Sequence, residues 1–170
     1  MNPKRLFLAV VSLLAAASLV FAAVAMGDHG RRDHGKGEHR GAKTFSASLA
    51  PSVPTDDPFH GRTPGGVPWS LDRGSVSITR GGDFRLRLDG LVITGTNSPR
   101  PVVSVSASLF CGADTNATPA FTSSTVPLSD SGDASIHEHV ALPATCLGPI
   151  VLVHPNGGTA RYIAVSGWKS

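Results

Sequence analysis

Two histidines at alternate positions, His137 and His139, are the residues of this sequence best placed to do chemistry. On an extended strand they point to the same face, about 7 Å apart along the chain. Two imidazoles at that spacing suit one zinc or copper ion. Such an ion needs a third ligand from elsewhere, and His60 or His154 would supply it. The pair therefore predicts a metal site as one alternative.

The same segment also fits a strand that binds no metal. Ser135 shares a face with the two histidines, while Ile136 and Val140 point the other way and would enter the core. Glu138 interrupts this alternation, so we expect it at the edge of the strand or turned outward by a bulge. Two histidines alone do not make a metal site. We therefore expect no cofactor, with zinc or copper as the alternative.

A second set of histidines lies near the N-terminus, where His29, His34 and His39 recur every five residues among Asp, Gly and basic residues. Flexible His-rich tracts bind zinc, nickel or copper weakly. The same composition is typical of a solvated linker, because it lacks the apolar side chains that a folded core needs. We expect residues 26–44 to form a disordered linker, with metal binding as the alternative.

Other kinds of catalytic site lack their motifs in this chain. No serine lies in a Gly-x-Ser-x-Gly elbow between a strand and a helix. Asp56 and Asp57 lie among prolines, which is typical of a turn rather than of paired catalytic carboxylates. Trp69, Tyr162 and Trp168 would form a sugar-stacking platform or, in a domain poor in aromatic residues, pack in its core. We expect a non-enzymatic protein, with a secreted metalloenzyme as the third choice.

The first 25 residues have the pattern of a secretory signal peptide. A short basic start precedes the apolar stretch Leu6–Ala25, which ends in the small residues that signal peptidase requires. We expect cleavage between Ala25 and Met26. The alternative is an uncleaved apolar helix, because about 20 apolar residues span a bilayer. Either way the domain lies in the cell envelope or outside the cell, and a membrane is its partner only if the helix stays uncleaved.

The chain has two cysteines, Cys111 and Cys146. They would be free thiols in a reducing compartment, but in an exported chain such a pair usually forms a disulfide. In the chain-entropy model, closing a loop of this length stabilises a domain by about 3–4 kcal/mol. We therefore expect one disulfide.

The formal net charge of +3 belongs to the N-terminal segment. Seven of the fifteen basic residues precede residue 45, whereas residues 45–170 carry eight basic and nine acidic residues. A nucleic-acid-binding domain needs a basic face of its own. We therefore expect no nucleic acid as partner, and an unknown partner in the envelope or outside the cell.

From residue 45 onward, short runs of alternating apolar and polar residues are separated by Gly, Pro, Asp and Asn. This pattern predicts an all-β domain, an antiparallel β-sandwich of about eight strands over residues 45–170. The clearest hairpin joins residues 75–79 to residues 84–94 through a turn at residues 80–83, and it puts Phe84, Leu86 and Leu88 inward. Further strands are expected at residues 45–49, 67–71, 102–110, 121–128, 134–142, 150–153 and 161–168.

Six segments of this region, taken in order along the chain, carry a likeness to a protein family: residues 66–74, 88–93, 108–111, 133–136, 142–147 and 162–167. Together they resemble a group of exported actinobacterial proteins of unknown function. The resemblance implies a disulfide-bonded β-domain and no known activity. In that group the strand after Asp133 usually lacks the two histidines, so His137 and His139 look like a local variation.

Two other likenesses cover less of the chain. The opening at residues 45–49 and the hairpin after Gly74 are similar to CHRD-type domains, but the His-containing motif of that family is missing at the matching place. The pair His137 and His139, together with the two cysteines, is similar to copper–zinc superoxide dismutase. That enzyme needs four copper ligands and a second metal site, which this chain does not supply.

Overall fold

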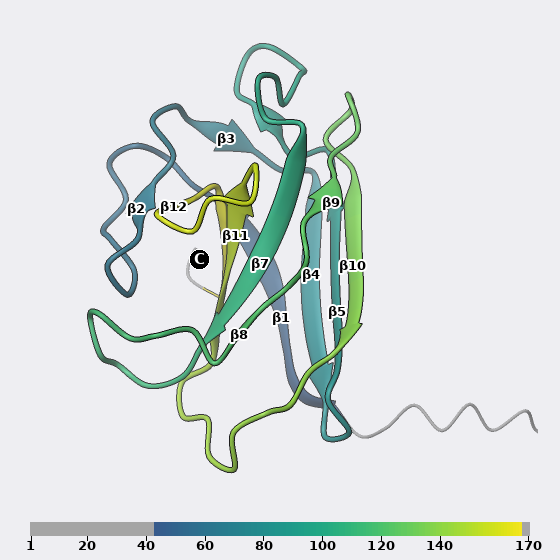
Figure 1. Ribbon diagram of the computed structural model, residues 1–170. Helices are drawn as coiled ribbons and strands as arrows, with labels where there is room; N and C mark the ends of the chain where they lie inside the picture. The colour runs from purple at the N-terminus through teal and green to yellow at the C-terminus, as the bar shows by residue number, and fades with distance from the viewer. Residues whose placement is uncertain (1–42, 168–170) are drawn as a thin grey trace, which may run out of the picture. The chain divides into compact units, whose positions relative to one another are not determined.

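In the computed structural model the described residues are 43–167, and no helix occurs among them. The all-β prediction is therefore confirmed for this part of the chain (Figure 1). The expected signal peptide, its cleavage site at Ala25 and Met26, and residues 26–42 of the expected linker lie outside the described residues.

Thirteen strands of different lengths occur among residues 43–167. Seven of them have three or more residues: β1 (Lys43–Pro51), β4 (Arg73–Thr79), β5 (Asp83–Asp89), β7 (Ser104–Phe110), β10 (Ala134–His139), β11 (Ile150–Pro155) and β13 (Ala164–Ser166). Six have two residues: β2 (Thr63–Pro64), β3 (Trp69–Ser70), β6 (Val92–Ile93), β8 (Phe121–Thr122), β9 (Val126–Pro127) and β12 (Arg161–Tyr162).

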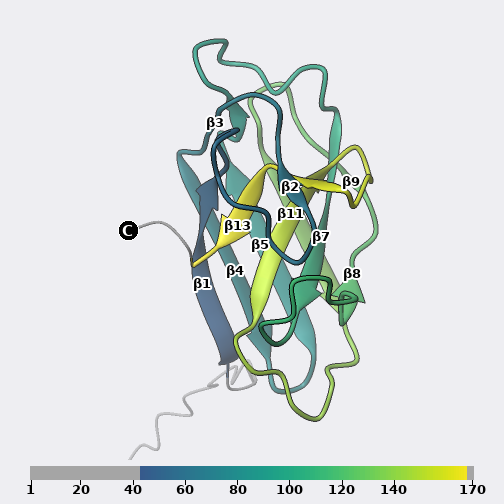
Figure 2. The same cartoon turned by 90° about the vertical axis from the view of Figure 1, so that its left-hand side faces the viewer.

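Nine of these strands form one antiparallel sheet in the order β10-β5-β4-β1-β13-β11-β7-β8, with β9 also paired to β7. The predicted sandwich of two separate sheets is not confirmed, because β1 belongs to both halves of this sheet. Residues 43–48 of β1 pair with β4, and Leu49–Pro51 pair with β13. The sheet curls at this strand, so β4, β5 and β10 lie on one side of the domain and β7 and β11 on the other (Figures 1 and 2).

The main core fills the space between the two halves of the curled sheet. Phe84, Leu86 and Leu88 of β5 are buried as predicted, and they belong to the same cluster as Val105 of β7 and Val153 of β11. Burying a side chain of this size stabilises the fold by about 1.5–3 kcal/mol. The strict alternation of β5 therefore directs one face into the core and leaves Arg85 and Arg87 in solvent.

The outer face of the β7–β11–β13 half is covered as well. It carries a second buried cluster of Phe110, Leu152, Tyr162 and Val165, against which Phe59 packs. Phe59 comes from the Pro- and Gly-rich segment 52–66, which crosses this face and is fixed there by a parallel pairing of β2 with β12. This segment, which we call the lid, therefore covers one face of the sheet.

Most of the expected strands have other bounds in the structure, and two of these differences have a clear cause. The expected strand 121–128 is divided into β8 and β9 at Ser123. The Ser123 hydroxyl takes the place of a backbone carbonyl as the acceptor for the Ala107 amide of β7. The same hydroxyl donates a hydrogen bond to the Ser124 carbonyl. At the other end, β1 begins at Lys43 rather than at Phe45, since Lys43 pairs with Thr79. The boundary expected at residue 44 between linker and domain therefore falls inside a strand.

Candidate functional site

His137 and His139 lie on the solvent face of β10, as the alternation predicts. Their neighbours across the ladder are Arg85 and Asp83 of β5. The Nδ1 atom of His139 lies 3.7 Å from the Asp83 carboxylate, and three quarters of the His139 side chain is exposed. His137 thus lies opposite a cation and His139 opposite a carboxylate. The two histidines and their neighbours therefore do not make up one set of metal ligands.

The two histidines considered as third ligands lie elsewhere. His60 is on the lid segment and His154 is on β11, and both are buried. Among residues 43–167 there is no group of three or more His, Cys, Asp or Glu side chains that could hold a metal ion. A zinc or copper ion bound by His137 and His139 would therefore find no third protein ligand among residues 43–167. His29, His34 and His39 lie outside the described residues.

Glu138, which interrupts the alternation, has a defined partner. Its carboxylate accepts hydrogen bonds from the amide (3.0 Å) and the hydroxyl of Ser124. Ser124 lies between β8 and β9 at the far edge of the sheet order, whereas Glu138 is on β10 at the other edge. The contact therefore joins the two edges of the curled sheet, and the side chain is only half-buried, as an edge position allows.

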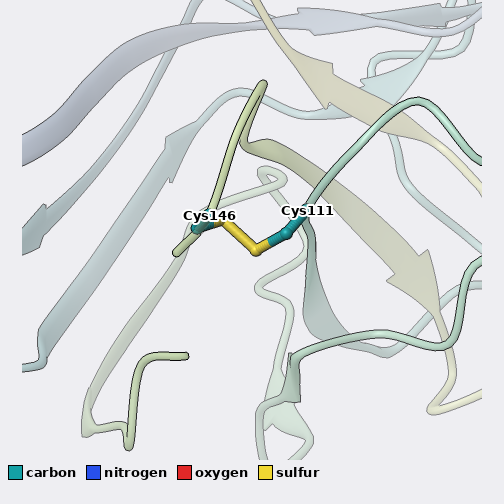
Figure 3. The surroundings of a disulfide bond; sticks show 2 residues. All are labelled: Cys111 and Cys146. Carbon is teal, nitrogen blue, oxygen red and sulfur yellow. A yellow bond between two sulfur atoms is a disulfide. The ribbon is translucent and has the colours of Figure 1, made fainter. Parts of the chain in front are cut away.

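The predicted disulfide is confirmed: Cys111 and Cys146 are bonded, with their Cα atoms 4.9 Å apart. Figure 3 shows that the bridge joins the chain just after β7 to the loop that leads into β11. Next to it, the Gly112 amide donates a hydrogen bond of 2.6 Å to the Leu147 carbonyl. The two loops are therefore held together by a covalent bond and a backbone contact.

A hollow of about 590 Å³ opens beside this disulfide. Three segments line it, one from the lid and one from each of the loops that the disulfide joins: Pro58, Phe59, His60, Gly112, Ala113, Asp114, Thr115, Leu147, Gly148 and Ile150. Leu147 is 72% exposed at the edge of this hollow. A smaller hollow of about 330 Å³ continues along Phe59, Gly148 and Ile150.

His60 is the polar group that is most firmly held in this hollow. Its ring stacks on Phe110 with centroids 4.7 Å apart and planes within 5° of parallel. Its Nδ1 lies 2.6 Å from the Asp114 carbonyl, which only accepts, so Nδ1 carries the proton. In a neutral ring Nε2 is then the acceptor. The backbone of His60 has φ of 47°, a left-handed conformation that costs energy in a residue other than glycine.

Arg62 fixes the lid above Phe110. Its guanidinium donates hydrogen bonds to the carbonyls of His60 and Ala117, and its Cζ lies 4.8 Å from the centroid of the Phe110 ring. One bond stays within the lid and the other crosses to the loop after the disulfide. Arg62 therefore ties together two of the three segments that line the hollow.

Beneath the lid, two titratable side chains are fully buried on the outer face of the sheet. Burial, and secondarily the positive charge of Arg62, lowers the pKa of His154 below its ordinary value, although its Nδ1 donates to the Arg161 carbonyl. Burial, with the nearby carboxylates of Asp56 and Asp57, raises the pKa of Tyr162 to about 12. Its hydroxyl donates to the Asp57 carbonyl at 2.8 Å. Both shifts favour the neutral form of the side chain.

The aromatic platform considered from the sequence does not form from the described residues. Trp69 and Tyr162 are both buried, and Trp168 lies outside the described part. The Asp56 carboxylate accepts a hydrogen bond from the Val53 amide. This contact closes a turn, as expected from the sequence for the segment that contains Asp56 and Asp57. The residues that sequence reasoning missed are Phe59 and Leu147. An aromatic residue in a Pro-rich loop and a leucine directly after a cysteine were the available signals.

Nothing among residues 43–167 forms a helix of the length and apolar character that crossing a membrane requires. Comparison with models of protein families, with curated proteins and with solved structures yields no match for this chain.

Proposed function

We propose that this protein is an exported, non-enzymatic binding domain of the cell envelope or extracellular space, and that its ligand enters the hollow beside the disulfide. The observation that carries the proposal is the hollow itself, which has the volume of a small-molecule or side-chain site and is lined mostly by apolar groups, with His60, Asp114 and Thr115 as its polar side chains. In this proposal the halves of the curled sheet act as the layers of a β-sandwich that carries the three lining segments.

Export is supported by the N-terminal signal pattern and by the disulfide, which persists in oxidising compartments. The resemblance to exported actinobacterial proteins points the same way. Without the bridge, the loops that contain Gly112 and Leu147 would be joined by the single backbone hydrogen bond between them. An oxidising environment therefore also preserves the proposed binding site.

The lining specifies the chemistry of the ligand. Phe59, Leu147 and Ile150 favour an aromatic or branched apolar group, which would be removed from water on binding. With Nδ1 donating to the Asp114 carbonyl, Nε2 is the ring nitrogen of His60 that is left to accept a hydrogen bond from a ligand. We propose a ligand that combines an apolar ring or branched group with one hydroxyl or N–H donor.

Phenol and toluene are probes that separate these two contributions, and both can be titrated into the isotope-labelled domain while amide signals are recorded by NMR. We expect saturable shifts at Gly112, Ala113 and Gly148, with phenol binding about tenfold more tightly than toluene because its hydroxyl donates to His60. Shifts scattered over the surface, or none at the hollow, would contradict the proposal.

A matched pair of surface substitutions provides the control. Leu147→Asp places a charge at the mouth of the hollow and should abolish binding of both probes. Val103→Asp makes the same change at another exposed apolar residue, 47% exposed, which precedes β7 whereas Gly112 follows it. That variant should bind phenol as the unmodified protein does. Equal loss in both variants would show that the shifts do not report the hollow.

A further inference from the structure

The outer face of the β1–β4–β5–β10 half of the sheet carries two complete rows of polar side chains. Each row crosses the four strands through directly paired residues. The first is Ser48–Ser75–Arg87–Ser135 and the second is Ser46–Ser77–Arg85–His137. We call these eight residues the serine–arginine face. None of them is buried, and six of the eight are serine or histidine.

The geometry of a sheet spaces these groups regularly. Neighbouring strands lie about 4.8 Å apart, and residues two positions apart along a strand lie about 7 Å apart. Serine side chains are short, so the surface over β1 and β4 is low and carries hydroxyl groups. The longer side chains of Arg85 and Arg87 project from the neighbouring strand β5. The face therefore offers two guanidinium groups at a fixed spacing next to a strip of hydrogen-bonding hydroxyls.

Charge is unevenly distributed over the domain. The strands β1, β4, β5 and β10, with the turn between β4 and β5, hold five basic and three acidic residues of the described part. The remainder of residues 43–167 holds three basic and six acidic residues. A domain with a small negative net charge thus presents a positive field on one half, which attracts anions to it.

Arg85 is one of the five basic residues of this half. Its two neighbours across the ladders are Ser77 and His137, and neither is an anion. Arg87, in contrast, pairs with Asp89 at 3.0 Å. A histidine opposite an arginine brings no stabilisation to the sheet, because like charges directly opposite destabilise it when the histidine is protonated. An external anion would therefore meet a cation, Arg85, that has no anion opposite it on either neighbouring strand.

We propose that the serine–arginine face binds a linear anionic polysaccharide, with Arg85 and Arg87 holding its phosphate or sulfate groups and the serines holding its hydroxyls. Guanidinium groups match tetrahedral oxyanions through paired hydrogen bonds. The face has no Phe, Tyr or Trp on which bases could stack, which disfavours single-stranded nucleic acid. It also has no apolar residue to insert into a lipid surface, which disfavours a membrane.

This site is distinct from the proposed function of the hollow, because the two are built on different strands. The hollow is lined by the lid and by the loops after β7 and before β11, and none of its residues belongs to the serine–arginine face. Loss of binding at one site therefore leaves the other testable.

The test uses fluorescein-labelled heparin as the sulfated probe, with fluorescence anisotropy as the measurement. We expect saturable binding that weakens as salt is raised, since exposed charges are screened. Arg85→Gln should weaken binding about tenfold, the loss of one charge-assisted contact. Arg100→Gln removes another exposed arginine, one that pairs with Asp130 away from this face, and should leave affinity within about twofold.

Ser77→Asp keeps both arginines and places a carboxylate directly opposite Arg85. We expect this variant to fold normally and to lose heparin binding as Arg85→Gln does. A phosphate-bearing glycopolymer should bind in competition with heparin, and neutral dextran should not bind. The proposal is overturned if Ser77→Asp and Arg100→Gln behave alike, if dextran competes, or if a single-stranded oligonucleotide binds more tightly than heparin.

Discussion

Glu138 on β10 accepts two hydrogen bonds from Ser124, a residue that lies between β8 and β9. In the sheet order these elements occupy opposite ends, so one carboxylate joins the first edge to the last. Exposed sheet edges invite pairing with other chains. Alternation along β10 places Glu138 on the face that carries the buried Ile136. The curling of the sheet brings Ser124 to that face, and Ser124 gives the Glu138 carboxylate its hydrogen-bond donors.

Removing this contact should weaken the closure of the sheet. We expect Glu138→Ala to lower the free energy of unfolding by about 1 kcal/mol, because the Ser124 amide and hydroxyl lose their acceptor but can bind water instead. Glu138→Gln keeps an acceptor oxygen and should recover most of that loss. Urea unfolding followed by circular dichroism measures both, and identical midpoints for the Ala variant and the unmodified protein would refute the role.

Gly132 and Gly95 provide a matched comparison of backbone strain. Both have φ of +84°, but a Cβ on Gly132 would lie 2.4 Å from the carbonyl oxygen of Leu91, whereas on Gly95 it would meet nothing within 4 Å. Gly95→Ala should cost about 1–2 kcal/mol, the price of a left-handed conformation alone.

Gly132→Ala should cost several kcal/mol, because the Leu91 backbone must also move and its amide loses its hydrogen bond to Gly132. Such a large value for one methyl group is exceptional and points to a steric cause. Thermal unfolding of the two variants side by side is the measurement. Similar melting temperatures would show that the close approach to Leu91 relaxes freely.

The disulfide should contribute to stability and to the order of the loops. Replacing Cys111 and Cys146 together by serine is expected to lower the free energy of unfolding by about 3–4 kcal/mol, since the unfolded chain regains the entropy of an open loop. The Gly112 amide should also exchange with solvent faster. Reductant should destabilise the unmodified protein and leave the double variant unchanged, and a variant that still responds to reductant would contradict this assignment.

Acid should destabilise the lid through His154. Burial lowers the pKa of His154 below its ordinary value of 6.5, so below that pH the unfolded chain binds more protons than the folded one. Its contribution is therefore complete above pH 6.5 and is lost as pH falls toward the lowered pKa. The free energy of unfolding should fall by at most about 1.4 kcal/mol per pH unit for this one proton.

Urea titrations between pH 8 and about pH 5 measure this effect, a range that avoids the carboxylates, which titrate near pH 4. His154→Gln should reduce the dependence on pH, whereas His137→Gln, at an exposed position, should retain it. An unchanged slope in the His154 variant would assign the acid sensitivity to another group.

The hairpin of β4 and β5 and the exposure of Arg85, Arg87, His137 and His139 could be predicted because alternation is local to each strand. The single curled sheet could not. It depends on β1 leaving β4 and joining β13, and Leu49 and Ser166 are partners far apart in sequence. Turn residues predict a hairpin such as β4–β5. No pattern within β1 predicts that its first part will pair with β4 and its last part with β13.

The site was predicted only in part. The disulfide followed from the compartment argument, and His60 drew attention as a possible ligand. Its actual surroundings, Phe110 and Asp114, come from β7 and the loop after it, about fifty residues away in the sequence. Hollows of this kind are formed where loops meet, so their lining carries no periodicity that a sequence could reveal.

The placement of β13 between β1 and β11 has a consequence for how the chain folds. The two halves of the sheet meet through strands from opposite ends of the described residues, so the contacts that join them have high contact order and form slowly. The β4–β5 and β7–β11 pairings can form first, as separate open ribbons. A ribosome-bound chain that has not yet delivered Ala164–Ser166 would therefore expose the unpaired Leu49–Pro51 end of β1, so the two halves of the sheet can be joined only after β13 has been made.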